Sequence, residues 1–127
     1  MSEGGTFELV GVDHVQLAMP AGQEAAAETF YAGCLGLEVM AKPAVLAARG
    51  GRWFAGAHVH LHLGVDEEFR SAKKAHPALV VANLDALVEV LEAGGYPVVW
   101  DAEIPGVRRC YVADPFGNRI ELIDRAP

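Results

Sequence analysis

The stretch YVADPFGNRIELI, residues 111–123, contains two strand-like runs separated by a turn. Residues 114–118 (DPFGN) have the composition of a turn, in which Gly117 supplies the backbone freedom that a tight turn needs. Alternation in the last run places Glu121 on one face and Ile120 and Leu122 on the other. The stretch therefore predicts a strand with an aliphatic side that packs and a polar side that stays open.

Two further strand-like stretches each carry a histidine. His14 lies in VDHVQLAM and His76 in AHPALVV, and positions 14 and 76 are 62 residues apart, close to half of the chain. This spacing suggests one module used twice. Two imidazoles and a carboxylate that converge, while leaving coordination positions open, are suited to a catalytic divalent metal. The hypothesis is a metal triad of His14, His76 and Glu121.

The expected elements repeat the order strand, helix and three strands. The first module, residues 7–64, is expected to contain a strand at 12–19, a helix at 23–35, a strand at 37–40, a hairpin around Gly50 and Gly51 within 44–56, and a strand at 58–64. After a linker at 65–75, the second module, 76–124, is expected to contain a strand at 76–82, a helix at 83–95, and strands at 97–100, 107–113 and 119–124. Asn83 and Gly94-Gly95 have the types expected at the two ends of the second helix.

Composition limits the class of protein. The chain has 127 residues, 52% hydrophobic and 21% charged, which predicts a single packed domain over residues 1–127. Its net charge of −7 weighs against nucleic-acid binding. The acidic N-terminal MSEGGTFELV does not resemble a signal peptide, and no apolar run approaches a membrane span. Cys34 and Cys110 lack metal-motif spacing, so a cytoplasmic protein with reduced thiols is expected.

Four segments carry a resemblance to a known family: VDHVQLAMP, ETFYAGCLGLEV, NLDALVEVLEAGG and YVADPFGNRIELI. Together they cover residues 11–124 and resemble the vicinal oxygen chelate superfamily, which includes glyoxalase I, extradiol dioxygenases, fosfomycin-resistance enzymes and bleomycin-resistance proteins. The resemblance implies an α+β fold in which two βαβββ modules form an open, cup-like, mixed-sheet barrel with helices outside. It also implies a homodimer, and leaves open whether the modules pair within or between subunits.

The same resemblance implies the roles of particular residues. The family's ligand pattern falls on His14, His76 and Glu121, and some members take a fourth ligand from the last strand of the first module. Here that ligand would be His60, with His58 as a weaker alternative. The metal would be Fe, Mn, Ni, Co or Zn, because two imidazoles and one carboxylate suit all of them.

Further polar residues share the expected open faces. Tyr111 is the candidate for a catalytic role beside Glu121, because the family commonly places a polar, substrate-facing group on that strand. Gln16, His62 and Arg109 are the candidates for substrate contacts.

The resemblance favours a metal-dependent lyase, isomerase or ring-opening dioxygenase acting on a small molecule through two adjacent oxygens. Common extradiol dioxygenases have four modules, and the segment WDAEIPGVRR lacks the lysines and serines expected of a fosfomycin-resistance enzyme. Glyoxalase I would need a carboxylate where this chain has histidines. The alternative is a metal-free protein that sequesters an antibiotic or metabolite, as bleomycin-resistance proteins do.

Overall fold

The computed structural model describes residues 4–126, so Met1–Glu3 and Pro127, the ends of the expected domain, lie outside the described residues. The first sheet has the spatial order β1-β4-β3-β2 and consists of β1 (Val15–Met19), β2 (Glu38–Met40), β3 (Arg52–Ala55) and β4 (His60–Val65). The second has the order β5-β8-β7-β6 and consists of β5 (Ala78–Val81), β6 (Val99–Asp101), β7 (Arg109–Ala113) and β8 (Arg119–Asp124). The helices are α1 (Glu24–Ala27), the π-helix η1 (Glu28–Cys34), α2 (Ala44–Ala47) and α3 (Leu84–Ala93).

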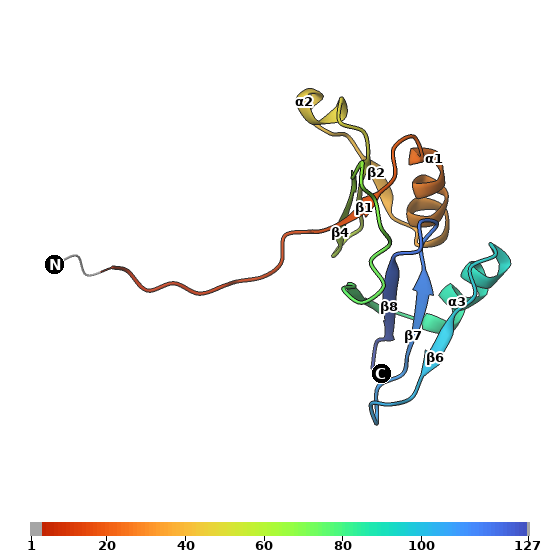
Figure 1. Ribbon diagram of the computed structural model, residues 1–127. Helices are drawn as coiled ribbons and strands as arrows, with labels where there is room; N and C mark the ends of the chain where they lie inside the picture. The colour runs from red at the N-terminus through yellow and green to blue at the C-terminus, as the bar shows by residue number, and fades with distance from the viewer. Residues whose placement is uncertain (1–3, 127) are drawn as a thin grey trace.

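Both sheets have the same topology. The first and last strands of each module run parallel, β1 beside β4 and β5 beside β8, and the remaining pairs are antiparallel. The two sheets remain separate and do not close into one barrel (Figure 1). This arrangement confirms the expected α+β fold of two βαβββ modules with an open cup.

One apolar core joins the modules. Leu61 and Leu63 of β4, and Ile120 and Leu122 of β8, are almost completely buried, and they pack in one cluster with Phe30 of η1. The expected packing of α3 is confirmed, because its Leu84 and Leu91 are buried in the same cluster while Leu87 and Val88 pack against it. Burial of alternate residues on β4 and β8 leaves the opposite faces of both sheets for polar side chains.

The ends of α3 follow the expected chemistry. Asn83 has a left-handed backbone (φ 62°), and its side chain accepts a hydrogen bond from the Ala86 N–H at 3.3 Å, which caps the first turn. Gly95 has φ 87°, a conformation that favours glycine, where the chain leaves the helix. Both ends of this helix were therefore readable from the sequence.

The expected hairpin at 44–56 is wrong in its first arm. Residues 44–47 form the short helix α2 after Pro43, and β3 pairs with β2. The run AVLAA contains good helix formers, so local propensity prevails where no neighbouring strand is available. Gly51 has φ 83°, and a Cβ there would lie 2.2 Å from the Leu63 carbonyl oxygen, so only glycine fits between α2 and β3.

Several strands begin later than expected, and for two of them the shift affects a candidate ligand. β1 starts at Val15 and β5 at Ala78, so His14 and His76 each lie just before a strand rather than within it. For β1, the parallel partner β4 begins at His60, and the paired register begins with Val15 opposite Leu61. For β5, Pro77 has no N–H to donate to a ladder. Both histidines thus lie in the loop just before the first strand of a module.

The segment before β1 extends away from the rest of the molecule (Figure 1). It contains Phe7 and Leu9, which are 90% and 94% exposed. Of the helices within residues 4–126, none is long and apolar enough to cross a membrane. Cys34 and Cys110 are both free thiols, as expected.

A buried polar cluster connects the DPFGN turn to the first module. The Tyr31 hydroxyl on η1 donates to Asp114 Oδ2 at 2.7 Å, and the Asn118 side chain donates to the Ala18 carbonyl at 2.9 Å. Burial and the neighbouring Asp114 carboxylate raise the pKa of Tyr31, which keeps the hydroxyl protonated and able to donate. Gly117 in this turn has φ 83°, as its expected role requires.

Candidate metal and substrate site

The open face of the second sheet carries most of its ionisable side chains. Tyr111 of β7 lies opposite Glu121 of β8, and Asp101 of β6 lies opposite Arg109 of β7. Because residues that face one another across strands project from the same side, a single surface is formed. We call it the ionic face: Val99, Asp101, Arg109, Tyr111, Arg119 and Glu121.

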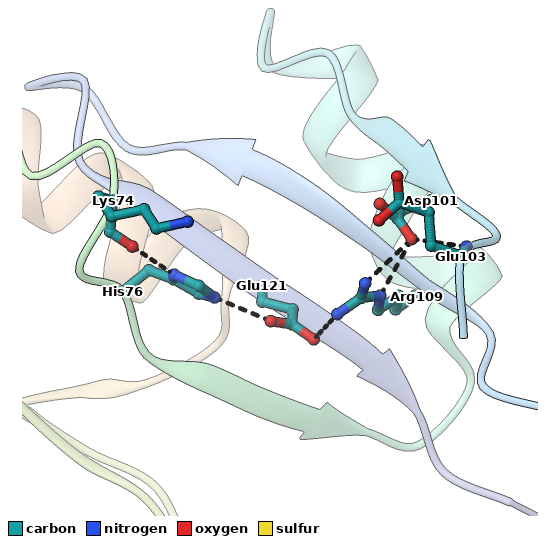
Figure 2. Close-up of polar contacts among 6 residues, drawn as sticks. All are labelled: Lys74, His76, Asp101, Glu103, Arg109 and Glu121. Carbon is teal, nitrogen blue, oxygen red and sulfur yellow. Dashed lines mark hydrogen bonds and ion pairs between the residues drawn. The ribbon is translucent and has the colours of Figure 1, made fainter.

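His76 reaches this face and contacts Glu121 (Figure 2). Its Nδ1 lies 2.8 Å from the Lys74 carbonyl oxygen, and its Nε2 lies 2.9 Å from Glu121 Oε1. A carbonyl and an ionised carboxylate can only accept hydrogen bonds, so the proton positions follow from the partners. Nδ1 is placed to donate to the carbonyl, and Nε2 and Oε1 are close enough to share a proton or another cation.

The contact between His76 and Glu121 fits two ligands of one metal ion. Imidazole nitrogen and carboxylate oxygen bind such ions at about 2.1 Å, so two neighbouring ligands at a right angle lie about 3 Å apart. The observed separation of Nε2 and Oε1 is 2.9 Å. The bond from Nδ1 to a backbone carbonyl also has the form that orients metal-binding histidines.

Arg109 occupies the other oxygen of Glu121. Its guanidinium donates to Glu121 Oε2 at 3.0 Å and to Asp101 Oδ1 at 3.0 Å, so His76, Glu121, Arg109 and Asp101 form one chain (Figure 2). Burial raises the pKa of Glu121, but hydrogen bonds from His76 and Arg109 outweigh burial and hold that pKa below its ordinary value. The expected substrate contact Arg109 is therefore engaged with two carboxylates of its own chain.

The open face of the first sheet is dominated by stacked aromatic rings. The His14 and His62 rings are stacked with centroids 4.0 Å apart, and the Trp53 ring stacks on the other side of His62 at 4.3 Å. Burial and the nearby His14 lower the pKa of His62. His14 Nδ1 lies 2.9 Å from Asp13 Oδ2, a contact that places a proton on Nδ1 and leaves Nε2 available to a ligand.

We call this surface the histidine face: His14, Gln16, Trp53, His60 and His62. These residues line one cavity of about 520 Å³ together with Asp13 and parts of β2 and β3. His60 is exposed at the start of β4, and His58 lies before that strand. The expected substrate contacts Gln16 and His62 are direct partners across β1 and β4.

Register identifies which residue of β4 corresponds to Glu121. Gln16 pairs with His62 in the first sheet, and Ala78 pairs with Glu121 in the second. Since positions 16 and 78 are related by the 62-residue repeat, His62 is the structural counterpart of Glu121. His60, expected as the fourth ligand, lies two positions earlier on the same face.

In the part of the chain that the structure describes, the histidine face and the ionic face do not combine into one metal-binding cluster. Among residues 4–126, no three His, Cys, Asp or Glu side chains are close enough to hold a metal ion together. Of the expected triad, the structure joins His76 to Glu121 and places His14 against His62 instead. Tyr111 lies near the joined pair, with its ring centroid 5.8 Å from that of His76.

Several contacts of these faces were missed by sequence reasoning. Asp101 is one, because a carboxylate after the apolar run PVVW gives no sign of pairing with Arg109 eight residues later. Asp13 is another, although its position directly before His14 in VDHV was a usable signal. The Lys74 carbonyl is a backbone group, so no side-chain pattern could indicate it.

Residues 16–123 match the family model of the glyoxalase-like domain. The match spans most of the sequence, so the chain belongs to the glyoxalase-like domain family, and the resemblance to the vicinal oxygen chelate superfamily is confirmed. No curated protein matches the chain.

Solved structures support the same assignment. A glyoxalase family protein from Bacillus anthracis is 42% identical, with 96% of this chain and 100% of that chain covered and a TM-score of 0.90. The fosfomycin resistance protein FosX from Listeria monocytogenes is similar in fold at 15% identity, with coverages of 94% and 96% and a TM-score of 0.73. A point mutant of that protein, complexed with Mn(II) and 1S,2S-dihydroxypropylphosphonic acid, is 16% identical over 94% of this chain and 95% of that chain, with a TM-score of 0.76.

Proposed function

We propose that the protein is a divalent-metal-dependent enzyme that acts on a small molecule bound through two adjacent oxygens. The observation that carries this proposal is the 2.9 Å contact between His76 Nε2 and Glu121 Oε1, which are close enough to share a proton or a metal cation. A bound metal would supply Lewis acidity and stabilise negative charge on the substrate oxygens. The reaction class is that of a lyase, an isomerase or a ring-opening dioxygenase.

Residues on and beside the ionic face have distinct parts in this proposal. His76 and Glu121 hold the ion, and the Lys74 carbonyl fixes the His76 ring through Nδ1. Arg109, bonded to Oε2, orients the Glu121 carboxylate and partly neutralises it. Tyr111, across the strand from Glu121, is assigned to proton exchange with the substrate together with that carboxylate.

The third ligand comes from His14 of a second copy. Its side chain is 39% exposed and its Nε2 is available, but within the described chain it lies against His62 rather than His76. The ionic face also leaves Val99 67% exposed, and Val80 of the neighbouring β5 is 64% exposed. Exposed apolar side chains beside an incomplete site support a homodimer in which each histidine face covers an ionic face.

A fourth ligand would come from β4. His60 fits the family pattern, whereas His62 occupies the register position that corresponds to Glu121 and contacts His14. Metal content of the separate His60→Ala and His62→Ala variants distinguishes the two, because loss of a real ligand weakens binding and loss of a neighbour does not.

A second candidate function is metal-free sequestration of a small ligand. It is favoured by one observation: both oxygens of Glu121 already have partners in the chain, His76 and Arg109. A carboxylate satisfied in this way does not require a metal ion. The net charge of −7 would suit a cationic drug or metabolite.

Metal content decides between the two candidates. We would measure it by inductively coupled plasma mass spectrometry on untagged protein, as purified and after reconstitution with each divalent ion. The proposal predicts near-stoichiometric metal in the wild type and in the control Glu89→Ala, whose side chain is exposed on α3, and its loss in Glu121→Ala. Absence of metal from the wild type after every reconstitution would favour sequestration.

A further inference from the structure

A second cavity opens on the ionic face beside the proposed metal ligands. It has a volume of about 420 Å³ and is lined by Lys73, Pro97, Val99, Tyr111, Ala113 and Arg119, among others. Tyr111 lies directly across from Glu121, so the cavity and the His76–Glu121 pair share a wall. A small molecule bound at the pair would extend into this cavity, whose volume falls in the usual range for ligand sites.

The charged residues that line the cavity are all cationic. Lys73 and Arg119 supply positive charge, and no aspartate or glutamate is among the lining residues. Within residues 4–126, neither side chain forms an ion pair, whereas Arg52, Arg108 and Arg109 all do. In a chain with a net charge of −7, two cations at one cavity that form no ion pair are available to an anion.

Arg119 is also held in place. Its guanidinium carbon lies 3.9 Å from the centroid of the Tyr111 ring, a cation–π contact that orders a long side chain before a ligand arrives. The carboxylates closest along the face, Glu121 and Asp101, are engaged by Arg109 at 3.0 Å each, which reduces their repulsion of an incoming anion. Both carboxylates are thus ion-paired with Arg109, and Arg119 acts on Asp101 only as a nearby charge.

We infer that this cavity binds the anionic group of a small organic acid. The arginine fork and the lysine ammonium suit a carboxylate, phosphate or phosphonate, and Pro97, Val99 and Ala113 provide apolar contact for the carbon skeleton. The further claim that this acid is the substrate of the neighbouring metal centre rests on the proposed function. It then defines the substrate class: an acid whose charged end lies between Lys73 and Arg119 while its adjacent oxygens reach His76 and Glu121.

The test is a titration of metal-stripped, full-length protein followed by ¹⁵N nuclear magnetic resonance. The probes are propanoate, methylphosphonate, inorganic phosphate and the neutral propanamide. Saturable shifts of the Ala113, Gly117 and Arg119 amides are expected with the anions and not with propanamide. Preference for methylphosphonate or phosphate over propanoate would identify a phosphorus oxyanion as the natural group, and the reverse would identify a carboxylate.

Matched variants locate the binding. Lys73→Met and Arg119→Gln should each weaken anion binding about tenfold, since each removes one charged partner. The controls Arg70→Gln and Arg125→Gln remove exposed cations that do not line the cavity and should leave binding unchanged. Unsaturable shifts, equal binding of propanamide, or equal weakening by the controls would overturn the inference. Because no metal is present, this outcome is independent of the metal measurement.

Discussion

The two modules share strand order and register but present different chemistry on their open faces. His62 of β4 and Glu121 of β8 occupy equivalent positions, opposite Gln16 and Ala78. In the first module this position holds an imidazole stacked on His14 at 4.0 Å, whereas in the second it holds a carboxylate bonded to His76 at 2.9 Å. The repeated backbone therefore fixes where a side chain lies, and the residue type alone decides what it can bind.

This difference makes the two faces complementary. The ionic face offers a metal ion the carboxylate of Glu121, which Arg109 holds in place. The histidine face offers the imidazole of His14, which Asp13 orients. A site with two imidazoles and one carboxylate needs residues from both, yet one chain does not bring them together in the part that the structure describes.

Mixing two inactive variants tests whether the faces combine between copies. His14→Ala and Glu121→Ala should each lose all bound metal. Refolding them together should restore about a quarter of the wild-type metal content, because random pairing makes half of the dimers mixed and each mixed dimer contains one intact site of two. Metal per chain in the refolded mixture is the measurement.

The matched control for this mixing experiment uses variants of two ligands that come from the same module. His76→Ala mixed with Glu121→Ala should restore no metal, because every site then lacks either His76 or Glu121. If His14→Ala and Glu121→Ala also fail to restore metal although mixed dimers form, the histidine face does not complete the site of a second copy.

Substitution of Tyr31 tests how strongly the modules are coupled. Tyr31→Phe removes the hydroxyl that donates to Asp114 of the other module and leaves a buried acceptor with one partner fewer. We expect the free energy of unfolding to fall by about 1–3 kcal/mol in a urea titration. The control is Tyr96→Phe, since Tyr96 also packs edge-to-face on Phe30 but makes no side-chain hydrogen bond within residues 4–126.

The control should change the free energy of unfolding by less than about 0.5 kcal/mol. Equal effects of the two substitutions would mean that loss of the hydroxyl, rather than loss of the contact between modules, accounts for the change.

The smallest effect concerns a contact of the first module alone. That module has α2 between β2 and β3, whereas residues 102–108 between β6 and β7 form no helix. Glu24 Oε2 accepts the Gly51 N–H at 2.9 Å next to α2, and this bond holds the pKa of Glu24 below its ordinary value. The contact therefore stabilises the folded state while Glu24 is ionised.

The pH dependence follows from the direction of that shift. Because the folded pKa of Glu24 is lower than the unfolded one, the stabilisation is fully present above the unfolded pKa of about 4.3 and is lost as pH falls through the folded pKa. Comparison of wild type with Glu24→Gln by thermal unfolding should show a difference of less than about 1 kcal/mol at pH 7, since solvent screens the contact. A difference that does not shrink as the pH falls progressively below the unfolded pKa would contradict the role of the ionised carboxylate.

The periodicity of apolar residues predicted the strands and the helix that bury one face in the core. The alternation around Ile120 and Leu122 and the stripe of α3 were readable because burial repeats with the period of the element. The structure of residues 44–48 was not predicted correctly, because the run AVLAA suits either a strand or a helix. The absence of a neighbouring strand favoured the helix. The late start of β1 likewise depended on where β4 begins to pair.

The sequence by itself determined the repeated module, the family and the candidate ligands, since alternation, turn composition and the 62-residue spacing are properties of the chain. Only the tertiary structure decided that His76 meets Glu121, that Arg109 binds Glu121 and Asp101, and that His14 stacks on His62. The physical reason is that each of these contacts depends on strand register and on the packing of distant segments, which side-chain order along the chain does not specify.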